Sequence, residues 1–181
     1  MEVDTTILFI DVRGSTSMAE NLTPTEFSEL LQRFYSVSAH VLTHAKAFVD
    51  KLVGDEVTSY FLPGFVGSDH AQIAVDSGMN LLRAIGYGKK GGPWLQVGVG
   101  IHTGRAYFGM MTTEVGVRDL SAHGDDVNTT ARLVSEAKGG EIVLSEASYK
   151  AANLGWANLE SRSLSLKGKR DKFPARVLRV D

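Results

Sequence analysis

Residues 47–62 read "AFVDKLVGDEVTSYFL", which is two apolar, β-branched runs on either side of a Gly-Asp pair. Such runs, separated by a short turn that contains glycine, are typical of a β-hairpin with Asp55 at its tip. Lys51 lies three residues before the glycine, on a strand that we expect to be half buried. Because alternate residues of a strand share a face, Lys51 is predicted to share one with Val49 and Val53. A charged amine in that place, close to an acidic turn, requires an explanation.

One long helical pattern lies on each side of this hairpin. The first begins with "TPTE" at residues 23–26, a capping box with proline at the first helical position, and runs to about Ala45. The second begins after Ser68 or Asp69 and ends at a glycine within residues 86–88. Each helix is therefore long enough to cover one face of a small sheet.

Strand-like runs complete the pattern. "TTILFID" (residues 5–11) precedes the first helix, and "WLQVGVGIHTG" (94–104) and "RAYFGMMT" (105–112) are predicted to form two strands after the second helix. The order β-α-β-β-α-β predicts an α+β fold, with a ferredoxin-like core whose helices pack on a mostly antiparallel sheet. A third helix (residues 124–140) and extra C-terminal strands extend this core, and we expect one domain over residues 1–181.

The composition is that of an ordinary globular protein and excludes several classes of site and protein. Hydrophobic residues make up 43% of the chain, and the net charge of −2 gives no reason to expect nucleic-acid binding. The absence of cysteine excludes disulfides, thiolate nucleophiles and Cys-based zinc sites. There is no run of about 18 apolar residues, and the acidic N-terminus is not a signal peptide. We therefore expect a cytoplasmic domain, without direct membrane insertion, from a longer parent protein that carries a regulatory domain and is either cytoplasmic or membrane-attached.

Two aspartates, Asp11 and Asp55, stand at the ends of apolar strands that the predicted order places side by side. Carboxylates brought together in this way repel each other unless they are protonated or bridged by a cation. Paired Mg²⁺ or Mn²⁺ ions with a phosphate substrate would resolve that conflict. Taken alone, the two positions fit solvated turn aspartates better.

A glycine turn and a polar helix face offer further groups. The turn "VRGST" (residues 12–16) can point backbone N–H groups at an anion, although it is not a P-loop. Asn128 and Arg132 stand at i and i+4 of a helix, so an amide and a guanidinium can hold a ribose and a phosphate together. Taken alone, each feature fits a common turn or a solvated helix surface better.

Other features are not expected to carry chemistry. The glycines of "GVGIHTG" (residues 98–104) lack the spacing of a dinucleotide fingerprint, and a strand follows them. His40 and His44 share a helix face without a residue to complete a metal set, and His102 is isolated in the sequence. No nucleophile elbow is present.

Taken together, these residues resemble the catalytic domain of class III nucleotidyl cyclases, which convert ATP or GTP to the 3′,5′-cyclic monophosphate and pyrophosphate. Three motifs occur in order, FxDxxGST, KxxGDE and GDxVNxxARL, and the resemblance extends from "ILFIDVRGST" to "LKGKRDKFPARVLRV". One such motif could arise by chance, but three in order across 181 residues could not.

The resemblance implies a role for each motif residue, in a site with two Mg²⁺ or Mn²⁺ ions. The implied metal ligands are Asp11, Asp55 and the carbonyl of Val12; the base-reading residues are Lys51 and Ser121; the triphosphate-binding residues are Gly14, Ser15, Thr16 and Lys167; and the catalytic residues are Asn128, which orients the ribose, and Arg132, which stabilises charge in the transition state.

Base selection depends on Lys51, which matches a position that is lysine in adenylyl cyclases and glutamate in guanylyl cyclases. An ammonium group can only donate, which suits the N1 acceptor of adenine and not the N1–H of guanine. Ser121 departs from the Asp of many adenylyl cyclases and matches a bacterial-type subgroup with Thr or Ser. The resemblance therefore implies an adenylyl cyclase acting on ATP. The alternatives are a guanylyl cyclase and a catalytically silent nucleotide-binding dimerisation module; a diguanylate cyclase is disfavoured because no GGDEF-like signature occurs.

Active sites of this family form between two cyclase domains. The resemblance implies that one domain supplies the metal ligands and Lys51, while the other supplies Ser121, Asn128 and Arg132. Because this chain carries both groups of site residues, the resemblance implies a symmetric homodimer with two sites. Residues 111–124 are then expected to form the arm that contacts the partner subunit.

Overall fold

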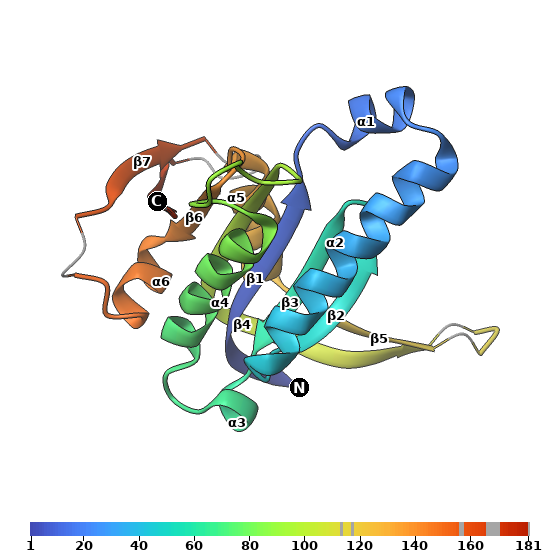
Figure 1. Ribbon diagram of the computed structural model, residues 1–181. Helices are drawn as coiled ribbons and strands as arrows, with labels where there is room; N and C mark the ends of the chain where they lie inside the picture. Colours follow the sequence, from blue (N-terminus) through green and yellow to red (C-terminus); the bar gives the residue numbers. More distant parts are fainter. Residues whose placement is uncertain (113, 117, 156–157, 166–170, 181) are drawn as a thin grey trace.

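The computed structural model describes residues 1–112, 114–116, 118–155, 158–165 and 171–180 (Figure 1). The elements in chain order are β1 (Glu2–Val12), α1 (Ser15–Asn21), α2 (Pro24–His44), β2 (Phe48–Val53), β3 (Glu56–Phe61), α3 (Pro63–Val66), α4 (His70–Ile85), β4 (Val97–Thr112), β5 (Arg118–His123), α5 (Asp125–Glu136), β6 (Glu141–Ser145), α6 (Glu146–Ala151), β7 (Glu160–Leu164) and β8 (Phe173–Arg179).

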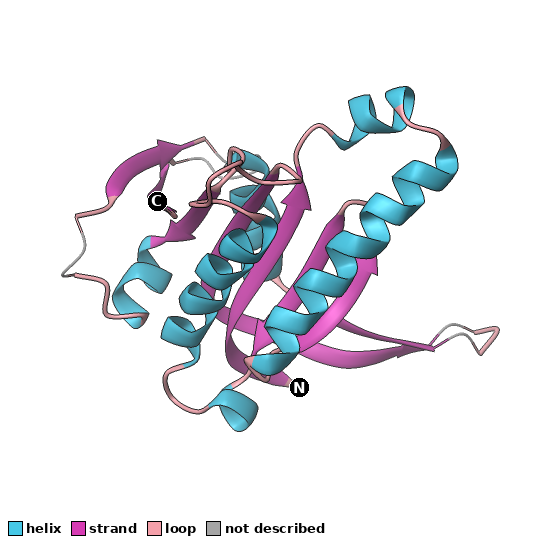
Figure 2. Cartoon of the chain, viewed as in Figure 1, coloured by secondary structure: helices cyan, strands magenta, loops and turns pink. Residues whose placement is uncertain are grey.

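The strands form one sheet in the order β2-β3-β1-β4-β6-β8-β7, and β5 pairs with β4 off this path (Figure 2). All the pairings are antiparallel except that of β4 with β6. The order β2-β3-β1-β4 is the one that a ferredoxin-like βαββαβ core produces. The predicted α+β fold, with its mostly antiparallel sheet and extra C-terminal strands, is therefore confirmed.

The two long helices begin and end where local signals predicted. The Thr23 side chain accepts a hydrogen bond from the backbone N–H of Glu26, and the Glu26 carboxylate accepts one from the N–H of Thr23. These reciprocal bonds satisfy two amides that the first turn of α2 leaves without helical partners. Helix α4 follows Asp69 and ends at Gly86, whose φ of 115° is in the left-handed region that favours glycine. Among the described residues, no helix is long and apolar enough to cross a membrane.

Helices cover both faces of the sheet. Leu8 and Ile10 of β1 are fully buried in the core cluster that contains α2 and α4, which lie together in front of the sheet in Figure 1. Ile7 and Phe9 point to the opposite face, where they share a cluster with Val134 of α5. This alternation along β1 is the two-residue period of a strand that is buried on both sides.

Helix α5 packs unusually close to β4. A Cβ atom added to Gly100 would lie 2.5 Å from the backbone nitrogen of Val134, and one added to Gly98 would lie 2.9 Å from Cβ of Ala137. The glycines that resembled a nucleotide fingerprint therefore admit a helix to the strand surface.

The structure corrects one part of the predicted strand pattern. Residues 94–104 and 105–112 do not form two strands, because β4 runs unbroken from Val97 to Thr112. Gly104 is not a turn: it pairs with Thr5 in the middle of the β1–β4 ladder. The second strand of this hairpin is β5, within the segment that was predicted only as a contact arm. Figure 1 shows the end of this hairpin extending away from the body of the domain.

A bulge in β2 changes the predicted surroundings of Lys51. Val49 pairs with Ser59 and Lys51 pairs with Thr58, so Asp50 is an extra residue between them. The extra residue reverses the alternation of side chains. Lys51 therefore does not share a face with Val49, which packs against the cluster containing α2 and α4. Lys51 instead lies on the face that α5 covers.

Candidate active site

The end of β1 and the tip of the β2–β3 hairpin are adjacent, as the sequence predicted. The backbone N–H of Val12 donates a 2.9 Å hydrogen bond to the carbonyl of Asp55, and Asp11 pairs in register with Glu56. Burial raises the pKa of Asp11, an effect that Arg13 opposes and Asp55 reinforces. Burial, followed by the charges of Asp11 and Asp55, also raises the pKa of Glu56. The strand ends thus concentrate negative charge in a partly dehydrated place.

Two neighbouring side chains offset that charge. The Arg13 guanidinium pairs with the Asp11 carboxylate and also donates a 3.3 Å hydrogen bond to the carbonyl of Ala137, at the C-terminal end of α5. The Ser15 hydroxyl donates to the Asp55 carboxylate. Neither contact was predicted, because each depends on how the turn after β1 folds back.

The Asp11 carboxylate retains unused capacity for a cation. Oδ1 of Asp11 is buried and has no hydrogen-bond partner. Such an orphaned acceptor beside a second carboxylate fits an oxygen-binding metal ion. Among the described residues, no group of three or more His, Asp or Glu side chains is arranged to hold a metal. Asp11 and Asp55 therefore fit a divalent metal ion whose remaining ligands come from water and substrate phosphates, and the part of the Val12 carbonyl stays a prediction.

The predicted base-reading residues lie side by side within one chain. Nζ of Lys51, on β2, is 3.4 Å from Oγ of Ser121, on β5, and Ser121 is buried. The sequence-based division placed these two residues on different subunits of a shared site. This contact does not fit that division, because the chain brings the lysine and the serine together without a partner.

The predicted catalytic pair is presented by α5. Leu133 and Val134 are buried on its inner side, whereas Asn128 is exposed and Arg132 is partly exposed. No hydrogen bond or ion pair joins the side chain of Asn128 or Arg132 to another residue in the described part of the chain. The amide and the guanidinium therefore remain available on one helix face, as their i, i+4 spacing predicted.

The predicted triphosphate-binding residues are described only in part. Gly14 has a φ of 73° and directly precedes α1, so the turn at residues 12–16 opens a short helix, with Thr16 exposed in its first turn. Whether these groups hold a phosphate stays a prediction. Lys167 lies outside the described residues.

His102, which was not expected from the sequence to carry chemistry, belongs to a hydrogen-bonded arrangement. His102 is buried, and its Nε2 lies 2.9 Å from Oδ1 of Asp126, in the first turn of α5. The only sequence signal was its place between glycines in a strand, and that signal does not reveal a partner 24 residues away.

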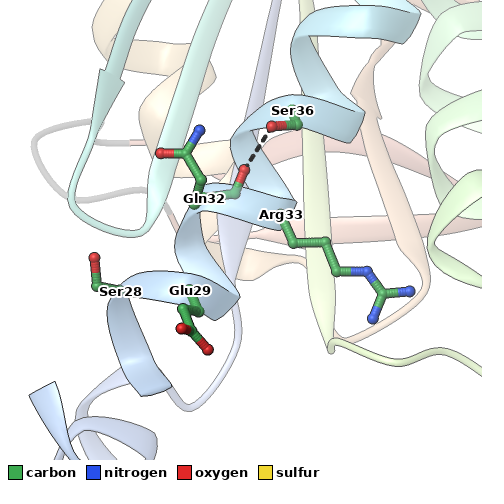
Figure 3. A pocket seen from close by; sticks show the side chains of 5 residues that line it. All are labelled: Ser28, Glu29, Gln32, Arg33 and Ser36. Atoms are coloured by element: carbon green, nitrogen blue, oxygen red, sulfur yellow. Dashed lines mark hydrogen bonds between the residues drawn. The ribbon is translucent and has the colours of Figure 1, made fainter. Parts of the chain in front are cut away.

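A pocket of about 520 Å³ lies on the outer side of α2 and contains none of the predicted site residues. Figure 3 shows the side chains around it projecting from a single helix, with the Ser36 hydroxyl bonded to the carbonyl of Gln32. Arg33 extends away from the others, with its guanidinium 4.0 Å from the centre of the Trp94 ring. The residues lining the pocket are Ser28, Glu29, Gln32, Arg33 and Ser36.

Comparison with known proteins gives consistent matches. A family model described as "Adenylate and Guanylate cyclase catalytic domain" matches residues 2–176. The adenylate cyclase of Anabaena cylindrica is 30% identical over 91% of this chain, and guanylate cyclase 32E of Drosophila melanogaster is 29% identical over 92%. The chain spans 34% and 15% of the lengths of these two relatives.

Solved structures agree with the sequence relatives. The guanylyl cyclase Cya2 superimposes with a TM-score of 0.85 at 29% identity, covering 98% of this chain and 92% of that one. The adenylyl cyclase CyaB from P. aeruginosa gives a TM-score of 0.82 at 25% identity, covering 100% and 96%. With the family model matching nearly its whole length, this chain belongs to the catalytic domains of the class III adenylate and guanylate cyclases, as its three motifs predicted.

Proposed function

We propose that this domain is an adenylyl cyclase, which converts ATP to 3′,5′-cyclic AMP and pyrophosphate in two sites shared across a homodimer. The family establishes a nucleotide cyclase, and its relatives here include both adenylate and guanylate cyclases. The observation that supports ATP is the Lys51 ammonium beside the Ser121 hydroxyl.

Hydrogen-bond chemistry favours adenine at this pair. The Lys51 ammonium can donate to N1 of adenine, whereas N1–H of guanine is itself a donor. The Ser121 hydroxyl both donates and accepts, so it adapts to a purine edge without selecting sharply. A guanylyl cyclase is the alternative, and in that case a donor-only side chain would face a donor.

The proximity of Lys51 and Ser121 leads to a revised division of the shared site. One subunit supplies this base-reading pair together with Asn128 and Arg132, which follow Ser121 closely in sequence. The other subunit supplies the metal ligands at the end of its β1 strand. The side chains of Asn128 and Arg132 have no hydrogen-bond or ion-pair partner among the described residues. This fits the revised division, in which their partners are groups of ATP.

The β4–β5 hairpin is the proposed contact between subunits. Several of its large apolar side chains are exposed, with Val115 at 86%. A cluster of such residues on an extended arm is typical of a protein interface. The exposed apolar residues are Tyr107, Met110, Met111, Val115 and Leu120.

Each side chain then has a defined task in the reaction. Asn128 orients the ribose so that the 3′-oxygen lies in line with the α-phosphorus, and Arg132 stabilises the charge that develops on the phosphate. Two Mg²⁺ or Mn²⁺ ions, held by Asp11, Asp55 and the carbonyl of Val12, would supply Lewis-acid activation and charge neutralisation. The bond from the 3′-oxygen to phosphorus forms as the bond to pyrophosphate breaks. The turn at residues 12–16, together with Lys167, holds the triphosphate.

Product identification tests this function. The purified domain is incubated separately with ATP and GTP in the presence of Mn²⁺, and the products are identified by chromatography and mass spectrometry. We expect cyclic AMP from ATP, with GTP a poor substrate. Cyclic GMP as the main product would establish the guanylyl alternative. A verified dimer that binds nucleotide and forms neither product would establish the silent dimerisation module.

A further inference from the structure

Asp126 attaches the first turn of α5 to β4 through both oxygens of its carboxylate. Oδ1 is 2.9 Å from Nε2 of His102, and Oδ2 accepts a 2.7 Å hydrogen bond from the backbone N–H of Arg105. The His102 side chain is 9% exposed and that of Asp126 is 32% exposed, so the contact is partly shielded from solvent. A carboxylate in the first turn of a helix is also favoured by the helix dipole.

The imidazole of His102 is held on its other side as well. Its Nδ1 lies 2.8 Å from Oγ of Ser145, and this hydroxyl also accepts a 3.1 Å bond from the N–H of Ser148, at the start of α6. Both ring nitrogens thus have partners, which fixes the orientation of the ring between β6 and α5. His102 therefore acts as a rigid support for Asp126.

Close packing leaves α5 little room to settle elsewhere. A Cβ atom on Gly104 would overlap the Asp126 carboxylate, and one on Gly100 would lie 2.5 Å from the nitrogen of Val134. Two glycines of β4 thus allow α5 to lie directly on the strand. The His102–Asp126 contact sets the distance between the first turn of α5 and β4.

The helix transmits this attachment to the catalytic pair. In an α-helix, residues two and six positions beyond Asp126 lie about 200° and 240° around the axis and about 3 and 9 Å along it. Asn128 and Arg132 therefore point away from β4, on the side opposite Asp126. Any slide or rotation of α5 on β4 displaces both groups together.

We infer that His102 and Asp126 form a positioning pair, which fixes α5 and so places Asn128 and Arg132 for the cyclase reaction. The inference rests on the proposed function for its catalytic consequence, but not for its structural part. Neither residue touches substrate in this role. Loss of the pair misplaces the transition-state contact of Arg132, and misplacement of about 1 Å can lower a rate by about 100-fold.

The test compares His102→Leu, His102→Gln, Asp126→Asn and the double variant His102→Leu/Asp126→Asn in the full chain. Ser59→Ala is the matched control, because it removes a buried 2.9 Å hydrogen bond to Leu8 that lies away from α5. Steady-state kinetics separate kcat from KM, and amide hydrogen exchange reports on Asp125–Glu136. If His102→Leu does not fold, Asp126→Asn, which keeps the size of the side chain, takes its place.

We expect His102→Leu to lower kcat by about 10- to 100-fold, with KM for ATP within about threefold and faster exchange in α5. His102→Gln retains a donor and should recover part of kcat, and the double variant should be no worse than the more affected single variant. The inference is wrong if His102→Leu leaves kcat unchanged, or if hydrogen exchange in α5 equals that of Ser59→Ala. It is also wrong if the effects of the two single substitutions on kcat multiply in the double variant. If the wild-type chain forms no cyclic nucleotide, the proposed function fails, and α5 exchange alone decides the structural inference.

Discussion

Replacing Glu141 by glutamine removes the charge at the centre of an ion-pair network that joins three strands. The carboxylate of Glu141, on β6, is only 4% exposed and accepts hydrogen bonds of 2.8 and 3.0 Å from the two terminal nitrogens of Arg162, on β7. Arg179, on β8, adds a third contact of 2.6 Å. The network fixes β7 and β8, the strands that flank Lys167 in sequence.

The magnitude follows from the pKa of Glu141. Hydrogen bonds from Arg162 lower this pKa from an ordinary value of 4.5 to about 2. The difference corresponds to about 3 kcal/mol of unfolding free energy at neutral pH. Because the pKa is depressed in the folded state, this stability is fully present above pH 4.5 and is lost as the pH falls toward 2. Glutamine has nearly the same size but cannot carry the charge.

Urea unfolding of the wild type and of Glu141→Gln at pH 7, 5 and 3 measures the effect. We expect a loss of about 3 kcal/mol at pH 7, similar at pH 5 and clearly smaller at pH 3, because Glu141 is then protonated in the unfolded chain while it is still largely ionised in the folded one. Glu160→Gln is the control, because Glu160 contacts the same two arginines but its side chain is 42% exposed. A loss at pH 7 no larger than that of the control, or one that does not shrink at low pH, would refute this reasoning.

Three further predictions concern the site. Asp11→Ala or Asp55→Ala should abolish metal-dependent cyclase activity and weaken Mn²⁺ binding measured by calorimetry, with an unchanged circular dichroism spectrum; retained turnover would remove the metal assignment. Lys51→Glu should lower kcat/KM for ATP by about 10- to 100-fold, the cost of losing a charge-assisted hydrogen bond; unchanged selectivity for ATP over GTP would show that the base is read elsewhere. Gly100→Ala should destabilise the fold by about 1–3 kcal/mol and lower kcat, because the new methyl group displaces α5. A wild-type urea midpoint would contradict the close packing of that helix.

Local signals account for the features that were predicted correctly. The capping box at Thr23 and Glu26, the glycine that ends α4, and the Gly-Asp hairpin tip each act within a few residues, so the sequence displays them directly. The predicted order of strands placed Asp11 beside Asp55, and the three motifs then supplied the family.

Features set by the sheet as a whole were not predictable. Gly104 was predicted to end a strand, whereas its actual role is to admit the Asp126 carboxylate. That role depends on a helix more than 20 residues further along the chain. The bulge at Asp50 has no sequence signal of its own, yet it decides the face on which Lys51 lies. The contact of Lys51 with Ser121 joins positions 70 residues apart, and it requires the β4–β5 hairpin. From the sequence, β4 was expected to be two strands, and the segment of β5 was predicted only as a contact arm.

Complementation between inactive or strongly impaired variants tests the central claim, that each site joins Lys51 and Arg132 of one subunit to Asp55 of the other. In an equal mixture of two variants, half of the dimers contain one chain of each kind. If the two changed residues belong to the parts of the site that different subunits supply, each mixed dimer has one intact site out of two. About a quarter of wild-type activity should then return. Asp55→Ala mixed with Lys51→Glu should recover this activity on ATP, and Lys51→Glu mixed with Arg132→Ala should not. Recovery only in the second mixture, with verified mixed dimers in both, would contradict the account.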